Sequence, residues 1–269
     1  MTMNLVSITR VRVAAAAIAL AAWAYAAGAA AQTAPAAAEN TGPNKSITRW
    51  AEGSYIYRGD NGARERGTEN FRLNVHPDGT RTLIMWHDLY ARNIQYTVVL
   101  RTAADFRPLQ AFANYWSENG YKGSILVTLN GERLHAVSTG PNGMVTQDLT
   151  VPRNISIGSH PVSGDGWHGW YIDEKAKGVQ ESGVIYGIES GGDLTKPALG
   201  ALRPQKFEVL GTEKITVPAG TFEAQKLRIA GTSEAWIMGP DKILLRMANA
   251  RGQDYVLATY KSGDNAKKN

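Results

Sequence analysis

Two histidines and an aspartate lie close together in the segment from His160 to Tyr171, which reads HPVSGDGWHGWY. The imidazoles of His160 and His168 and the carboxylate of Asp165 are groups that can hold a zinc or iron ion. The same groups can abstract and return a proton, with Tyr171 as the acid. The spacing matches no metalloenzyme signature and the chain has no H-E-x-x-H, so we predict no metal site. The simpler interpretation is an aromatic loop whose polar groups cap the mouth of a barrel.

A second candidate is the run Trp86-His87-Asp88-Leu89-Tyr90, at the end of an expected strand. In a regular strand Trp86 and Asp88 point to one face and His87 to the other, so His87 and Asp88 cannot meet without a bulge. We take Asp88 as a fourth candidate acid–base group. A strand end with ordinary hydrogen-bonded polar groups is the alternative interpretation.

Composition and missing motifs exclude several kinds of chemistry. The chain has no cysteine, which rules out thiol catalysis, iron–sulfur clusters and cysteine zinc sites. It has 29 basic and 24 acidic residues without a basic stripe, so a nucleic-acid partner is not expected. There is no nucleophile elbow and no P-loop, and the G-x-G-x-x-G match from Gly164 to Gly169 follows no βαβ unit. We therefore expect no nucleotide chemistry and no cofactor.

Aromatic side chains are abundant, with 7 Trp and 11 Tyr in the chain. Such side chains combine a large apolar surface with a polar tip, which suits a binding cavity, although barrel walls also use them for packing. Both interpretations stay open. As candidate ligand-binding residues we take six aromatic residues in the centre of the chain: Trp86, Tyr96, Trp116, Trp167, Trp170 and Tyr171.

Short strands joined by tight turns must position these residues. Phe71, Leu73 and Val75 alternate with polar residues, which indicates a half-buried strand, and Asp78-Gly79 then predicts a hairpin turn. Asn130-Gly131 predicts a second hairpin. Similar runs continue to about residue 151 and resume from 205 to 261. Ten or more strands without a long helical pattern predict an all-β fold, an antiparallel curved sheet that forms a barrel or half-barrel.

The segment from residue 152 to 200 interrupts this pattern, because it is rich in glycine and weakly periodic. A structureless stretch of this length is uncommon inside a compact domain. We interpret residues 155–200 as a lid, a plug or an edge-covering insertion, and expect a short helix within about Gly166 to Ile188.

The N-terminus resembles a secretory signal peptide. Arg10 and Arg12 precede the uncharged apolar run 13–30, which ends at an A-x-A type site before Gln32. We expect cleavage near Ala31/Gln32, a soluble periplasmic protein and at most transient contact with the envelope. The expected organisation is a signal peptide at 1–31, a disordered leader at 32–45, one β-barrel-like domain at 46–261 and a disordered tail at 262–269.

The C-terminal block carries a resemblance to a known family. It reads Val217-Pro-Ala-Gly-Thr-Phe-Glu-Ala224, followed by Trp236, Pro240 and the run Leu245-Arg246-Met247. This block resembles an uncharacterised family of periplasmic β-proteins with a V-P-A-G-T-[FY]-x-A hairpin, which are similar to the lipoprotein-carrier half-barrels. The resemblance covers about the last sixty residues and implies a curved sheet around an apolar cavity. It supplies no catalytic residues.

These observations together favour a periplasmic binding or carrier protein for an apolar or lipid-like small molecule held in a β-barrel cavity. The alternative is a cofactor-light enzyme, a lyase, hydratase or isomerase, that uses His160, Asp165, His168 or Asp88 for proton transfer. A third interpretation is an envelope scaffold without a small ligand, which predicts a collapsed interior.

Overall fold

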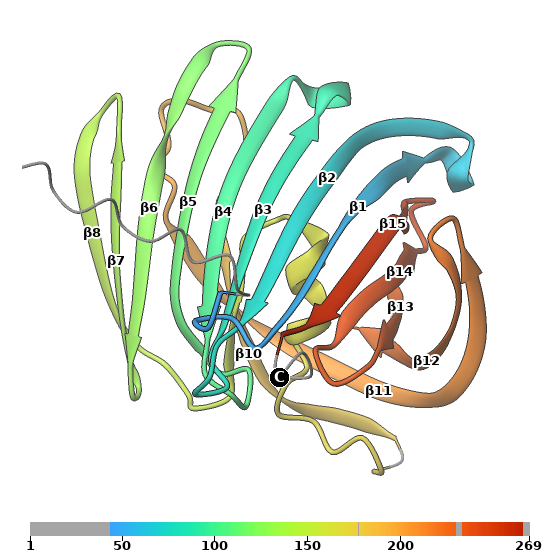
Figure 1. Ribbon diagram of the computed structural model, residues 1–269. Helices are drawn as coiled ribbons and strands as arrows, with labels where there is room; N and C mark the ends of the chain where they lie inside the picture. Colours follow the sequence, from blue (N-terminus) through green and yellow to red (C-terminus); the bar gives the residue numbers. More distant parts are fainter. Residues whose placement is uncertain (1–43, 177, 230–232, 266–269) are drawn as a thin grey trace, which may run out of the picture. The chain divides into compact units, whose positions relative to one another are not determined.

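The computed structural model describes residues 44–176, 178–229 and 233–265, without the side chains of 181 and 182. Within these ranges fifteen strands form one sheet in the order β8-β7-β6-β5-β4-β3-β2-β1-β15-β14-β13-β12-β11-β10-β9 (Figure 1). The strands are β1 Arg49–Gly59, β2 Arg64–Val75, β3 Arg81–Leu89, β4 Ile94–Thr102, β5 Pro108–Ser117, β6 Gly120–Asn130, β7 Arg133–Gly140, β8 Gly143–Thr150, β9 Ile155–Gly158, β10 Val179–Ile188, β11 Gly200–Val217, β12 Gly220–Ile229, β13 Ser233–Met238, β14 Ile243–Asn249 and β15 Asp254–Asp264. Three short 3-10 helices join them: η1 Asp60–Gly62, η2 Tyr90–Arg92 and η3 Val162–Trp167.

The predicted hairpins are confirmed, and they set the register of the sheet. The turn after Val75 carries Gly79 at a φ of 79°, a conformation that glycine adopts without strain. The turn between β6 and β7 carries Gly131 at a φ of 60°. β11 and β12 are joined in the same way, with Val217 paired to Gly220 around the Pro218–Ala219 turn. Neighbouring strands are therefore mostly sequence neighbours as well.

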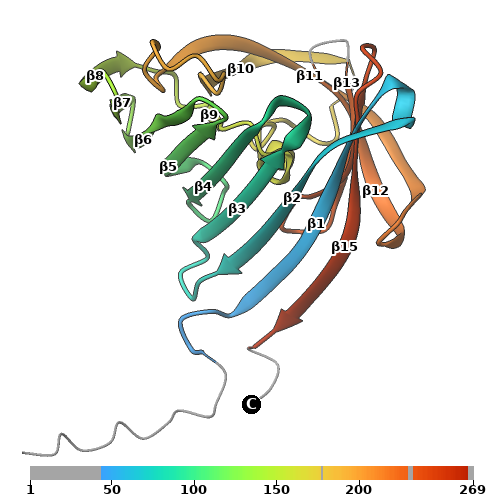
Figure 2. The ribbon, with the colours of Figure 1, turned by 90° about the horizontal axis from the view of Figure 1, so that it is seen from above.

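The sheet curves strongly but does not close, because its two ends are β8 and β9 (Figure 2). Along β2 every second side chain points to the inner face, so that Phe71, Leu73 and Val75 are buried. The alternation continues in β3 to β5, and the buried side chains make one continuous core. The predicted all-β curved sheet is therefore confirmed.

One strand pair departs from the expected antiparallel arrangement, since β9 and β10 run parallel. Parallel neighbours need a long crossover connection, and the connection between β9 and β10, which the structure describes for residues 159–176 and 178, supplies it. We call residues 159–176 the plug. Figure 2 shows the plug lying against the inner face of the curved sheet, with η3 at its centre. Of the three alternatives for the insertion, this part corresponds to the plug.

The short helix expected within Gly166–Ile188 was placed wrongly. The helix is η3, which begins earlier at Val162, and residues 179–188 form strand β10. The Tyr171 ring packs against β10 at Gly183, where a Cβ atom would overlap the Tyr171 hydroxyl. The position therefore requires glycine, and this glycine interrupts the alternating pattern by which a strand is recognised in the sequence.

The plug is attached to the sheet at Trp167. Its indole N–H donates to the carbonyl of Asp241 at 2.9 Å, and the Asp241 carboxylate pairs with two arginines. Arg49 Nη2 lies 2.6 Å and Arg81 Nε 3.1 Å from Asp241 Oδ1. Because these arginines come from β1 and β3, the ion pairs join those strands to the β13–β14 turn, whose Asp241 carbonyl accepts from Trp167.

Some sequence expectations fall outside the described residues. The expected signal peptide at 1–31 and the leader up to residue 43 lie there. At the other end β15 extends to Asp264, beyond the expected domain boundary at 261. In the described part of the chain, no helix has the length and hydropathy needed to cross a membrane.

Candidate functional site

A pocket of about 340 Å³ lies between the plug and the C-terminal half of the sheet. The plug contributes His160, Asp165 and His168. The sheet contributes an apolar wall and several polar groups from β9 to β14: Gly158, Ile185, Gly187, Ile188, Arg203, Gln205, Ile229, Ser233 and Met247, together with Ser190 after β10. Three of the four predicted acid–base residues thus meet in one pocket.

Asp165 and His168 form a hydrogen-bonded pair in which His168 Nε2 lies 3.0 Å from Asp165 Oδ1. The local structure explains the pair. A 3-10 helix has three residues per turn, so residues three apart lie on the same side. The backbone N–H of His168 also donates to the Asp165 carbonyl at 3.2 Å, which closes this turn. Both side chains are largely buried, so the plug fixes a carboxylate–imidazole pair inside the pocket.

His160 has a strained backbone, with a φ of 84° that non-glycine residues rarely adopt. Its ring stacks on Tyr96 at 4.8 Å and on His87 at 5.1 Å between centroids. Burial lowers the His160 pKa to about 4, although the nearby Asp165 carboxylate acts in the opposite direction. The imidazole is therefore neutral at pH 7, and its buried Nδ1 has no hydrogen-bond partner in the described part of the protein. Strain of this kind concentrates at functional sites.

His87 lies behind His160 and is fully buried. Its ring stacks on Tyr57 at 4.2 Å, and neither ring nitrogen has a partner among the described residues. Burial, and next the nearby His160, lower the His87 pKa to about 2. His87 is a neutral imidazole without a hydrogen-bond partner among the described residues and is not part of the pocket lining, so we assign it a packing role and no acid–base role.

Glu69 is a buried carboxylate that the sequence analysis did not select. It accepts hydrogen bonds from the Tyr57 hydroxyl at 2.5 Å and from the backbone N–H groups of Val162 and Ser163 at 2.7 and 3.1 Å. Burial raises its pKa to about 7, and these hydrogen bonds oppose the rise. A signal was present in the sequence, because the alternation of Phe71, Leu73 and Val75 extends back to Glu69 on the inner face.

The other predicted site residues lie elsewhere, which corrects the expectation that they line one interior cavity. Asp88 and Trp86 are exposed on the outer face of β3, because His87 occupies the inner position between them. Trp116 is exposed on the outer face of β5. The pocket lining contains none of the six candidate aromatic residues.

The inward-facing aromatic residues bond to and pack on their neighbours and do not line the pocket beside the plug. Tyr96 donates its hydroxyl to the Ser190 carbonyl at 2.8 Å, and Trp170 Nε1 donates to the Ile155 carbonyl at 2.9 Å. Tyr171 packs edge-on against Phe207. Trp167 and Trp170 enclose only about 10 Å³ of space with Phe106. On another side Trp170 lines a pocket of about 640 Å³, which shares no lining residue with the pocket beside the plug.

A metal site needs several ligand side chains that converge on one point. Among the residues that the structure describes, no group of three or more His, Asp or Glu side chains is arranged to hold a metal ion. His160 and the Asp165–His168 pair bring hydrogen-bonding side-chain atoms to the same pocket.

Comparisons with known proteins place the fold. No model of a protein family matches the chain, and no curated protein matches it. The chain is similar in structure to a β-barrel-like protein of a domain of unknown function, DUF1849, from Brucella abortus, with 9% identity and a TM-score of 0.53 over 81% of this chain and 98% of that one. A DUF1089 family protein from Pseudomonas aeruginosa matches 66% of this chain and 86% of its own at 13% identity, but its TM-score of 0.39 carries no argument. The first likeness supports a β-barrel-like fold and nothing about function.

Proposed function

We propose that the protein binds a small amphiphilic molecule in the pocket between the plug and strands β10–β14. One observation carries the proposal: the pocket combines an apolar wall with buried polar atoms that have no partner. His160 Nδ1 and Gln205 Oε1 are buried and unbonded within the described residues, and both residues line the pocket. An unsatisfied buried polar atom costs free energy, so a ligand that bonds to these atoms gains affinity.

The lining suggests the chemical class of the ligand. Ile185, Ile188, Ile229 and Met247 form the apolar wall, which suits a short hydrocarbon body. Arg203 is exposed at the pocket and has no ion-pair partner among the described residues, so it is available for a carboxylate. A volume of about 340 Å³ is at the small end of ligand pockets, so a single short chain fits better than a two-chain lipid. A medium-chain carboxylic acid meets these requirements.

We also propose that the protein works in the periplasm, with cleavage near Ala31/Gln32. The support is the arrangement of Arg10, Arg12, the uncharged apolar run and the small residues before Gln32. The resemblance of the C-terminal hairpin block to the lipoprotein-carrier half-barrels supports an apolar component in the ligand. A carrier role, in which the amphiphile is held during transit through the envelope, is consistent with both.

Calorimetric titration of decanoate into the purified protein tests the binding. We expect saturable one-to-one binding that Met247→Trp abolishes, because the larger side chain fills the pocket from the partly buried position on β14. Arg203→Gln should weaken binding about tenfold through loss of the carboxylate contact. Met144→Trp is the matched control, since Met144 is exposed on β8 far from the pocket lining. Absence of binding, or equal binding by Met247→Trp, would sink the proposal.

A second candidate function follows from the Asp165–His168 pair, whose 3.0 Å contact lies in the same pocket. The pair can take a proton from a bound molecule and return it, as a lyase, hydratase or isomerase requires. Incubating 3-oxodecanoate with the protein in D₂O tests this. Catalysis predicts deuterium at C2 faster than without protein, and loss of the excess in Asp165→Asn. Equal rates in both variants would rule the enzyme out while leaving binding intact.

A further inference from the structure

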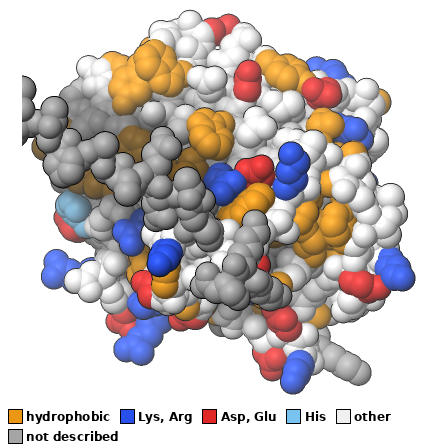
Figure 3. Space-filling model, in the orientation of Figure 1, with side chains coloured by type: hydrophobic (Ala, Val, Ile, Leu, Met, Phe, Trp, Pro, Cys, Tyr) orange, Lys and Arg blue, Asp and Glu red, His pale blue; other side chains and the backbone are white. Residues whose placement is uncertain are grey.

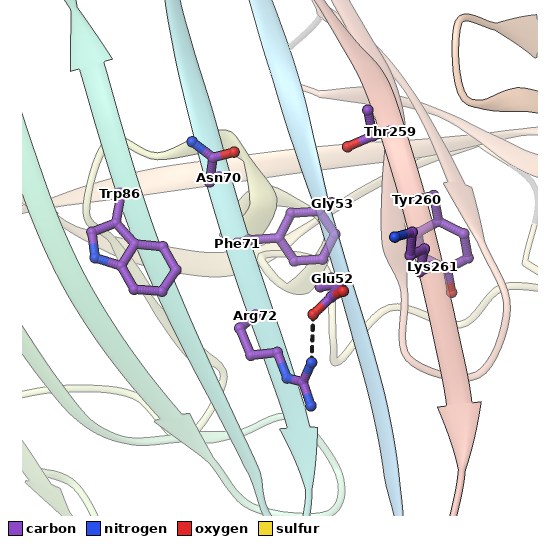
Figure 4. Close-up of a pocket in the computed structure, with 9 residues that line it drawn as sticks. All are labelled: Glu52, Gly53, Asn70, Phe71, Arg72, Trp86, Thr259, Tyr260 and Lys261. Atoms are coloured by element: carbon purple, nitrogen blue, oxygen red, sulfur yellow. Dashed lines mark hydrogen bonds and ion pairs between the residues drawn. The ribbon is translucent and has the colours of Figure 1, made fainter.

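A second pocket, of about 560 Å³, lies across β15, β1, β2 and β3. Figure 4 shows Trp86 on β3 at one side and Lys261 on β15 at the other, with Asn70, Arg72 and Glu52 between them. All five side chains stand on strands that are hydrogen-bonded neighbours in the sheet. The pocket is separate from the one beside the plug, because the two share no lining residue.

Trp86 gives this pocket an open aromatic surface. The side chain is 47% exposed although it stands in the middle of a strand, and its cross-strand neighbour on β2 is the polar Asn70. The indole therefore offers a flat apolar face to solvent beside hydrogen-bonding groups. An aromatic face of this kind attracts a ligand that is apolar on one side and polar around its rim.

The polar groups of the pocket are held in place. Arg72 Nη1 pairs with Glu52 Oε2 at 2.5 Å, and the guanidinium stacks over the Trp50 ring at 4.4 Å. The paired Glu52 and the stacked Trp50 restrict the Arg72 side chain, so its remaining donors have a fixed direction. Held donors and acceptors beside an aromatic face suit a ligand with many hydroxyl groups.

The charge of the pocket is unbalanced toward positive. Glu52 is matched by Arg72, whereas Lys261 has no ion-pair partner in the described part of the chain. The Asn70 amide likewise has no hydrogen-bond partner among the described residues. An ammonium and an amide that are free on the same face favour a ligand that carries a carboxylate as well as hydroxyl groups.

We propose that this pocket binds an acidic oligosaccharide. A pyranose ring has one face of C–H bonds, which can stack on the Trp86 indole, and a rim of hydroxyl groups for Asn70, Arg72 and Glu52. A uronate carboxylate pairs with Lys261. The pocket extends across four strands, so it accommodates more than one sugar unit.

A protein partner fits this surface less well. In the orientation of Figure 3, the uncovered hydrophobic side chains form separate patches between basic and acidic side chains. Stable protein interfaces have an apolar core from which charged residues are depleted. The pocket instead places three charged side chains around one exposed aromatic ring.

Titration with trigalacturonate and with its methyl-esterified form tests the proposal, because esterification removes the negative charges and keeps the sugar framework. We expect Trp86→Ala to weaken trigalacturonate binding about tenfold or more. Trp116→Ala should leave it unchanged, since Trp116 is a matched control that is 49% exposed and outside the pocket lining. Lys261→Ala should remove the preference for the acidic form, and Lys214→Ala on β11 should not.

Each possible result decides the proposal. No binding of either trisaccharide overturns it, and so does binding that Trp86→Ala leaves unchanged or that Trp116→Ala weakens equally. If both forms bind equally well to the unmodified protein, the acidic class is wrong. Decanoate binding by Trp86→Ala should equal that of the unmodified protein, which separates this pocket from the one beside the plug.

Discussion

The Glu69 carboxylate accepts the backbone N–H of Val162 at 2.7 Å, which joins strand β2 to the first residue of η3. The carboxylate is fully buried and also bonds Tyr57 and Ser163, so it holds the start of the plug against the sheet. His160 lies two residues before Val162, and Asp165 and His168 follow it. The orientation of the pocket groups therefore depends on a buried titratable group outside the pocket.

Glu69 makes the stability of the protein dependent on pH. Burial raises its pKa from 4.5 to about 7, so the folded state holds a proton that the unfolded state releases between these values. This contribution is present below pH 4.5 and is lost as the pH rises to 7, with a total of about 3 kcal/mol. Glu69→Gln cannot ionise. In urea unfolding, the free energy of unfolding of Glu69→Gln should therefore rise relative to that of the unmodified protein by about 3 kcal/mol between pH 4.5 and pH 8. The same pH dependence in both proteins would contradict this role of Glu69.

His87 makes the stability depend on pH in the opposite direction, because its contribution is lost as the pH falls. Its pKa is lowered to about 2 by burial, so only the unfolded state binds a proton as the pH falls below 6.5. The stability that depends on neutral His87 is lost progressively from pH 6.5 downward. As the pH falls from 8 to 5, the free energy of unfolding of His87→Phe should rise by about 2 kcal/mol relative to that of the unmodified protein. His135→Phe, which changes an exposed ring, is the matched control, and an equal pH effect there would refute the assignment.

Two glycines in η3 test how tightly the plug packs. A Cβ atom on Gly166 would lie 2.2 Å from the Lys242 carbonyl oxygen, whereas one on Gly164 would make ordinary contacts with Leu100 and Met85 at 3.8 and 3.9 Å. Gly166→Ala should therefore cost about 1–3 kcal/mol of the free energy of unfolding or more. Gly164→Ala should change it by less than about 1 kcal/mol. Denaturant titration measures both, and similar values would show that the plug is not seated as described.

Much of the fold was predictable because it is local. Asp78-Gly79 and Asn130-Gly131 specify tight turns, and alternation in the flanking runs fixes which side chains face inward. The strand β10 was missed, since Gly183 removes the apolar pattern at the position where the plug approaches. Its parallel pairing with β9 depends on a crossover through the interior, which no local pattern reveals.

The site was predicted in part for the same reason. His160, Asp165 and His168 are near in sequence, and a 3-10 turn is enough to bring the last two together. Trp86 was misplaced because the face of β3 that points inward depends on its pairing with β2 and β4. Glu69 contacts Val162 across 93 positions of sequence, so only the folded topology brings them together.

Intermolecular nuclear Overhauser effects between decanoate and methyl-labelled isoleucines test whether the ligand occupies the pocket beside the plug. We expect contacts from the decanoate chain to the methyl groups of Ile185, Ile188 and Ile229, which line the pocket beside the plug. Contacts confined to other isoleucines, such as the core residue Ile125 on β6, would contradict it. So would the absence of any contact at saturating decanoate.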